Sequence, residues 1–95
     1  MRRGNLKKTG QRTTLEPATT VFDEGKFLRI LFELPGIAEE KIKIDLENTI
    51  PSITIDASDT SVLYKKVISL PCEVKFCKKR FSEGILELTL EKNKS

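Results

Sequence analysis

Apolar and polar residues alternate along most of this chain, and this period of two is the pattern that most limits its fold. Four segments repeat an apolar side chain at every second position: 28–34, 42–46, 53–57 and 86–90. Side chains two apart in a strand point to the same side, so each segment predicts a strand with one buried and one solvated face. Segment 62–68 carries apolar residues on both faces and predicts a strand partly covered on each side.

Turn residues separate these segments at short intervals. Gly25 ends an Asp-Glu-Gly hairpin signal, Pro35 and Gly36 end the next strand, and residues 48–51 connect two more. A single helical turn is expected only over 38–41. Short, regularly spaced strands of this kind predict an all-β chain folded as an antiparallel, immunoglobulin-like β-sandwich. With 95 residues and 38% hydrophobic content, one domain is expected, over 18–92, followed by a tail at 93–95.

Three motifs resemble those of the α-crystallin domain of small heat-shock proteins. Residues 33–36 read Glu-Leu-Pro-Gly, residues 70–74 read Leu-Pro-Cys-Glu-Val, and residues 84–86 read Gly-Ile-Leu, in the order found in that family. Two positions depart from the family pattern: Glu83 stands where asparagine is usual, and Lys79 stands where alanine is common. The resemblance implies a sandwich of the α-crystallin or related p23-CS type.

The same resemblance implies a function in protein binding. Typical members of the family hold unfolding client proteins without ATP as part of the stress response, so we expect a chaperone-like protein-binding module without a cofactor. The alternative is an adaptor or structural accessory that binds one defined partner, as in gas-vesicle or ATPase-linked systems. A client-aggregation assay distinguishes these two classes.

The resemblance also implies a groove for a partner segment between the strands at 42–46 and 77–81. An extended segment would bury aliphatic side chains in such a groove, with pairing along a strand edge as an addition. The alternation equally explains the isoleucines as ordinary core residues. The candidate groove residues are Ile42, Ile44, Leu46, Cys77, Lys79 and Phe81.

Catalysis has little support in the composition. The chain has no histidine, which removes the commonest general base and the commonest zinc ligand. Cys72 and Cys77 lack further metal-ligating partners, and we interpret them as reduced structural thiols. No phosphate-binding glycine motif precedes a helix. We therefore expect no enzyme activity.

The N-terminal segment is strongly basic, and its few apolar residues predict a disordered arm over 1–17. Such an arm can contact nucleic acid, anionic lipid or an acidic partner, or it can simply be a solvated tail. Nucleic-acid binding is disfavoured, since no aromatic residue lies among these charges. We expect a cytoplasmic protein, because no apolar run is long enough to span a membrane. The basic residues of the arm are Arg2, Arg3, Lys7, Lys8 and Arg12.

Assembly is expected to be small. Four polar residues, 58–61, separate two predicted strands, and such a short hairpin cannot hold the strand that bacterial and plant members of the family exchange between subunits. Only residues 92–95 follow the last predicted strand, with no Ile-x-Ile tail of the kind that docks on a neighbouring subunit. We expect a monomer or a weak dimer.

Overall fold

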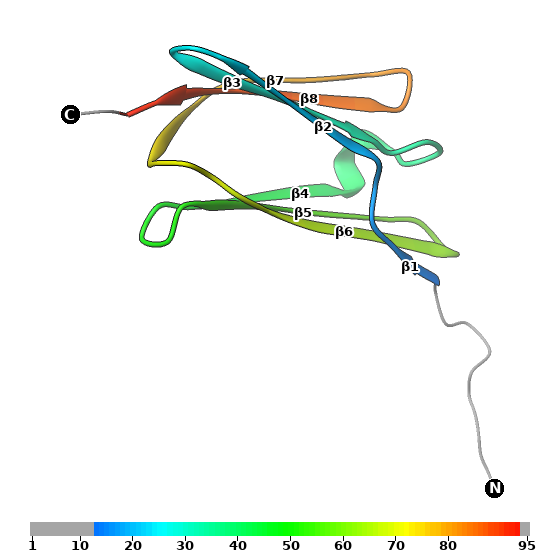
Figure 1. Ribbon diagram of the computed structural model, residues 1–95. Helices are drawn as coiled ribbons and strands as arrows, with labels where there is room; N and C mark the ends of the chain where they lie inside the picture. The colour runs from blue at the N-terminus through cyan, green and yellow to red at the C-terminus, as the bar shows by residue number, and fades with distance from the viewer. Residues whose placement is uncertain (1–12, 94–95) are drawn as a thin grey trace, which may run out of the picture.

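Two four-stranded sheets lie face to face in the computed structural model, which describes residues 13–93 (Figure 1). The strand order is β1-β6-β5-β4 in one sheet and β2-β3-β8-β7 in the other. The elements are β1 (Thr13–Leu15), β2 (Thr19–Glu24), β3 (Phe27–Glu33), the 3₁₀ turn η1 (Glu39–Lys41), β4 (Ile42–Glu47), β5 (Ser52–Ser58), β6 (Val62–Ser69), β7 (Val74–Ser82) and β8 (Ile85–Lys92).

The predicted β-sandwich is confirmed, including the single helical turn and the alternation that defines the core. Central strands β3, β5 and β8 alternate buried and more exposed residues, because each presents one face to the opposite sheet. All pairings are antiparallel except that of β1 with β6, which is parallel. The buried apolar residues are Leu28, Ile30, Phe32, Leu34, Ile37, Ile53, Ile55, Ala57, Val74, Leu86, Leu88 and Leu90.

The start of the fold differs from the expectation of a disordered arm through residue 17. Thr13–Leu15 forms strand β1, and Pro17 is buried. The backbone N–H of Thr13 donates to the carbonyl of Ser61 at 3.0 Å. Pairing with β6 therefore satisfies backbone polar groups of this segment and orders it, although the segment has few apolar residues to bury. Residues 1–12, which hold all five basic residues of the predicted arm, lie outside the described residues.

A short connection from β1 to β2 decides which sheet edges lie on the same side of the sandwich. Three residues, 16–18, carry the chain from one sheet to the other, so the edge strands β1 and β2 are neighbours (Figure 1). Since both sheets have four strands, β4 and β7 are the edge strands on the opposite side. This placement brings the two strands of the predicted groove to one edge of the sandwich.

The hairpin between β5 and β6 is as tight as the sequence predicted. Its loop consists of residues 59–61, and the carboxylate of Asp59 accepts from the backbone N–H groups of Ser61 and Val62, both at 2.8 Å. These bonds stabilise the turn locally. The loop has no room for an additional strand.

The turn between β7 and β8 joins two of the sequence motifs. Glu83 and Gly84 both have positive φ, 52° and 78°, as in the type I′ turns that suit two-residue hairpins. The backbone N–H of Leu34 donates to the carbonyl of Gly84 at 2.7 Å. A Cβ added at Gly84 would lie 3.3 Å from the Cα of Pro35. The glycine is therefore required both by its conformation and by its contact with the Leu34-Pro35 backbone.

Gly84→Ala should destabilise the protein more than Gly25→Ala, although both glycines have φ of 78°. Gly25 has no atom within 4 Å of an added Cβ, so its substitution measures the conformational cost alone, about 1 kcal/mol. Gly84→Ala adds the crowding against Pro35, for a total of about 2–3 kcal/mol. Urea unfolding of both variants provides the comparison. Equal losses would show that the Pro35 contact is unimportant.

Candidate functional site

Three apolar side chains of β4 face the core without being fully covered. Ile44 lies opposite the buried Ile55 on β5, and its neighbours on the same face, Ile42 and Leu46, are likewise half-buried and packed against the core. Because β4 is an edge strand, no further strand of its sheet covers their outer flank. Ile42, Ile44 and Leu46 therefore pack against the core and also remain partly accessible at the surface.

Strand β7 departs from simple alternation at a β-bulge between Phe76 and Lys78. Cys77 is the extra residue there and is exposed, so it does not share a face with Lys79 and Phe81 as the sequence predicted. A bulge inserts one unpaired residue and moves the following residues to the other face. Phe76 instead lies on the inward side of β7, opposite Leu90 of β8, and is 41% exposed.

The apolar residues Phe76 and Phe81 are five positions apart, and this odd spacing is the signal in the sequence that the strand changes phase between them. Inward-facing residues of β7 are spaced by two, then three, then two, at Val74, Phe76, Lys79 and Phe81. A change of phase within one strand is the mark of a bulge. We define the β4–β7 edge surface as the inward side chains of these two strands that remain at least partly accessible: Ile42, Ile44, Leu46, Phe76, Lys79 and Phe81.

Asn48 connects the two sheets at one end of this surface. Its side-chain amide nitrogen donates to the carbonyl of Val74 at 3.1 Å, and its amide oxygen accepts from the N–H of Val74, also at 3.1 Å. Asn48 follows β4, and Val74 begins β7, so one side chain replaces the pair of hydrogen bonds that a neighbouring strand would supply. Nothing in the sequence indicates this tie, because the two residues are 26 positions apart.

The charge on β7 is uniformly positive. Lys75, Lys78, Lys79 and Arg80 lie within Val74–Ser82, which contains no acidic residue. All four are exposed, and none forms an ion pair with a carboxylate of residues 13–93. An exposed strand edge thus carries both apolar and cationic groups.

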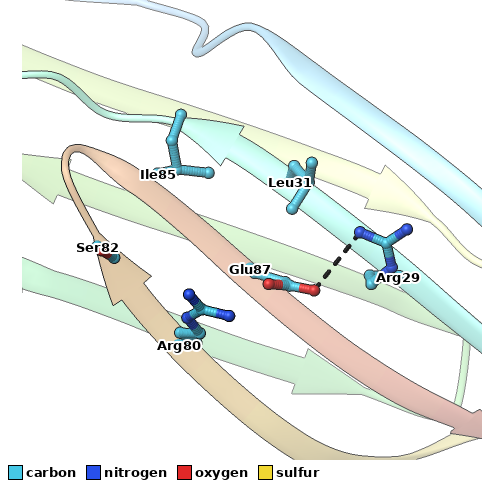
Figure 2. A pocket seen from close by; sticks show the side chains of 6 residues that line it. All are labelled: Arg29, Leu31, Arg80, Ser82, Ile85 and Glu87. Atoms are coloured by element: carbon cyan, nitrogen blue, oxygen red, sulfur yellow. Dashed lines mark ion pairs between the residues drawn. The ribbon is translucent and has the colours of Figure 1, made fainter.

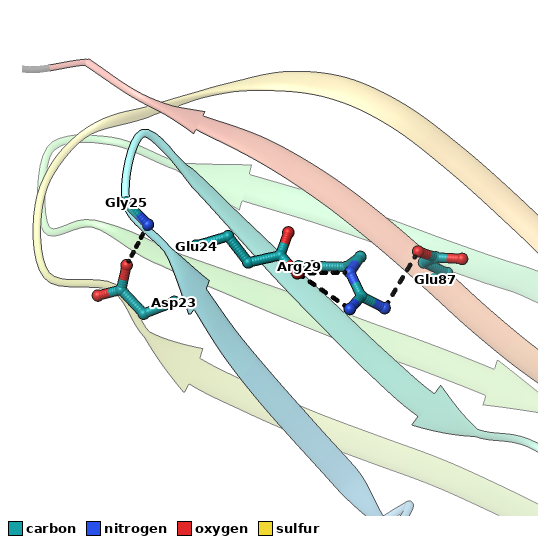
Figure 3. A network of polar contacts seen from close by, with 5 residues as sticks. All are labelled: Asp23, Glu24, Gly25, Arg29 and Glu87. Carbon is teal, nitrogen blue, oxygen red and sulfur yellow. Dashed lines mark hydrogen bonds and ion pairs between the residues drawn. The ribbon is translucent and has the colours of Figure 1, made fainter.

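A second candidate site is a hollow of about 280 Å³ on the outer face of the β2-β3-β8-β7 sheet (Figure 2). Its arginine on β3, Arg29, bonds Glu24 of β2 at 3.0 Å and Glu87 of β8 at 3.5 Å (Figure 3). The hydrogen bond to Glu24 is the main reason why the pKa of Arg29 is raised. Its guanidinium also lies 4.4 Å from the ring centre of Phe22. The charge of Arg29 is thus already engaged in linking three strands, which makes the hollow the weaker candidate. The lining residues are Arg29, Leu31, Arg80, Ser82, Ile85 and Glu87.

Both cysteines are free, with Cys72 in the loop before β7 and Cys77 at the bulge. Within residues 13–93, His, Cys, Asp and Glu side chains form no group of three that could hold a metal ion. In the same part of the chain, no helix has the length and apolar character needed to cross a membrane.

Comparison with known proteins matches this chain to a small heat-shock protein. The chain is 29% identical over 97 residues to the mitochondrial small heat shock protein hspI of Dictyostelium discoideum, a match that covers 81% of this chain and 44% of that protein. The chain thus spans less than half the length of this curated relative. No protein-family model matches it.

Solved structures of small heat-shock proteins share the fold. A mutant of hsp14.1 from Sulfolobus solfataricus superimposes with a TM-score of 0.68 at 22% identity, over 86% of this chain and 76% of that one. A small heat-shock protein from Xylella fastidiosa gives a TM-score of 0.71 at 14% identity, over 85% and 89% of the two chains. At these identities the likeness establishes the arrangement of the strands.

Asn48→Ala should destabilise the protein by about 1–3 kcal/mol, because the buried Val74 would lose partners for both its N–H and its carbonyl. Hydrogen exchange of the Val74 amide should accelerate in the variant. Thr49→Ala is the control, since it truncates an exposed residue of the same turn and should change stability by less than about 0.5 kcal/mol. Equal stability and equal Val74 exchange in the two variants would contradict the role of Asn48.

Proposed function

Because the chain carries an α-crystallin domain of the small heat-shock protein family, we propose that it is an ATP-independent, chaperone-like module that binds unfolding proteins. The observation that supports this proposal is the β4–β7 edge surface. There, the edge strands β4 and β7 carry apolar side chains that are half-buried or exposed, and no further strand of either sheet covers them. An exposed surface of this kind suits binding through burial of apolar groups.

A sheet edge can bind an extended segment through its backbone hydrogen-bonding groups and through its side chains. An extended client segment can add its backbone to an edge strand, and it can place alternate side chains against Ile44 on one side and Phe81 on the other. Each aliphatic side chain that becomes fully buried contributes about 1.5–3 kcal/mol relative to exposure. Two or three such residues contribute about 3–9 kcal/mol before the cost of ordering the segment is subtracted, so the binding is expected to be weak and reversible. No nucleotide hydrolysis is required for such an equilibrium.

The proposed site is tested by Phe76→Ser, with Val67→Ser as its control. Both residues are exposed apolar side chains on strands, 41% and 56% exposed, so neither substitution should disrupt the core. Phe76→Ser should weaken suppression of client aggregation, and binding of an Ile-x-Ile peptide followed by amide chemical shifts, by about five- to tenfold. Val67→Ser should leave both unchanged.

Three outcomes decide between the candidate functions. Equal effects of the two substitutions would argue against the β4–β7 edge surface as the site. Peptide binding without suppression of aggregation would favour the adaptor, in which one defined partner replaces many clients. Absence of both activities in the unmodified protein would contradict the proposal as a whole.

We further propose a monomer or a weak dimer in solution. The three-residue loop 59–61 leaves no segment to exchange between subunits, and β1 already pairs with the start of β6 at Val62 to Tyr64. Strand β1 thus covers part of the β6 edge with which a second copy would otherwise pair. The small heat-shock protein from Xylella fastidiosa is described as having a distinct high order structure, so assembly size would distinguish this chain from that one.

Light scattering after size-exclusion chromatography should give a mass of one or two chains. A weak dimer should dissociate on dilution, so any mass above that of one chain should fall towards one chain as the protein concentration is lowered. A stable assembly of roughly a dozen subunits would contradict the interpretation of loop 59–61.

Location is also part of the proposal. We propose the cytoplasm, while the curated Dictyostelium relative is named mitochondrial. The basic arm, Arg2 to Arg12, is proposed as a weak electrostatic contact or as a solvated tail.

A further inference from the structure

We propose that the β4–β7 edge surface selects extended protein segments that carry a carboxylate two residues from an apolar side chain, on the same face of the segment. We propose further that Lys79 determines this preference. This inference deepens the proposed function and rests on it. It assigns a chemical class to the client or partner segment, namely an acidic and aliphatic strand.

The first argument is the distribution of paired and unpaired cations. The four basic residues of β7 have no carboxylate partner within residues 13–93. On the other strands of that range only Lys43 also lacks one, and its strand β4 carries Asp45 and Glu47 as well. Unneutralised charge is thus concentrated on β7, a strand at the edge of its sheet. The basic residues that do form ion pairs, at 2.7–3.8 Å, are Lys26, Arg29, Lys65, Lys66 and Lys92.

The second argument is the direction of these side chains. Lys79 lies opposite Leu88, whose side chain is buried in the core, so Lys79 is on the inward side of β7 between Phe76 and Phe81. Arg80 lies opposite Glu87, which lines the hollow on the outer face. Both faces of β7 therefore present a cation close to the strand edge. A segment that pairs with β7 alternates its own side chains between the same two faces.

The third argument concerns the apolar neighbours of Lys79. A carboxylate placed beside Lys79 would have an aliphatic neighbour two residues away beside Phe81, since residues of one strand share a face at this spacing. Partial exclusion of water by the phenyl rings strengthens the attraction between the two charges relative to open solvent. A neutral residue at that position would leave the lysine ammonium without a partner.

A protein segment is favoured over nucleic acid by the charge of the other strand. The outward side chains of β4 include Asp45 and Glu47, both exposed, and these would repel a polyanion that follows the same edge. A short acidic segment confined to β7 avoids this repulsion. Single-stranded DNA therefore serves as a competing probe in the test.

The experiment compares three fluorescent peptides in which a glutamate, a glutamine or a lysine lies two residues from an isoleucine, so that both side chains share one face of the extended peptide. Fluorescence anisotropy with the full chain should show the glutamate peptide binding about five- to tenfold more tightly than the glutamine peptide at low salt, and the lysine peptide weakest. The difference should shrink at an ionic strength of about 0.5 M, where charges are screened within a few ångströms.

Lys79→Gln should reduce the preference for glutamate over glutamine by about two- to fivefold while leaving the affinity for the glutamine peptide unchanged. Lys43→Gln is the matched control, since it removes the same charge from an outward position on β4 and should not alter the preference.

The outcomes separate the two proposals. Equal binding of the glutamate and glutamine peptides would overturn the charge preference but leave the proposed function intact. Failure of all three peptides to bind would overturn both. A preference that falls equally in Lys79→Gln and Lys43→Gln would remove the role of Lys79. Binding of single-stranded DNA more tightly than the glutamate peptide, with the same loss in Lys79→Gln, would assign the surface to phosphates instead.

Discussion

The close approach of Gly84 to the Leu34-Pro35 backbone is the constraint on which the rest of the sandwich depends. The type I′ turn at Glu83 and Gly84 sets the register of β7 against β8, and the hydrogen bond from Leu34 to Gly84 fixes that hairpin to the end of β3. A shift of one residue would move every β8 side chain to the other face and place its leucines in solvent. Glu83, with φ of 52°, adopts a conformation that asparagine tolerates better, so the turn is maintained at some cost in stability.

The two long sides of the sandwich are built differently. On one side the chain itself crosses between the sheets at residues 16–18, and Lys66, which faces inward on β6, pairs with Glu16 at 3.0 Å. On the other side the tie between β4 and β7 at one end of the surface is the amide of Asn48. The first arrangement uses backbone and charge to protect a sheet edge. The second leaves apolar side chains accessible, and this difference is why the proposed binding surface lies between β4 and β7.

Paired and unpaired charges also lie in different parts of the sandwich. On the outer face of the β2-β3-β8-β7 sheet, Arg29 joins three strands through Glu24 and Glu87, so its charge serves the stability of the sheet (Figure 3). On β7 the cations have no such partners among the described residues. Surface ion pairs contribute little to folding individually, so the lack of partners on β7 has little effect on stability. It does leave those cations available for a ligand.

Alternation and turn residues were sufficient to predict strands β3, β4, β5, β6 and β8, the helical turn at Glu39–Lys41 and most of the core, because side-chain direction in a strand repeats every two residues regardless of what lies across from it. The tertiary structure decided the rest. The bulge that removes Cys77 from the β4–β7 edge surface and places Phe76 on it depends on how β7 pairs with β8. Strand β1 forms because an edge of β6 is available for pairing. The Asn48 tie joins residues 26 positions apart, and the meeting of β4 with β7 follows from which edges the connection at 16–18 brings together. Contacts of this kind depend on distances between strands, which a local pattern of residues does not contain.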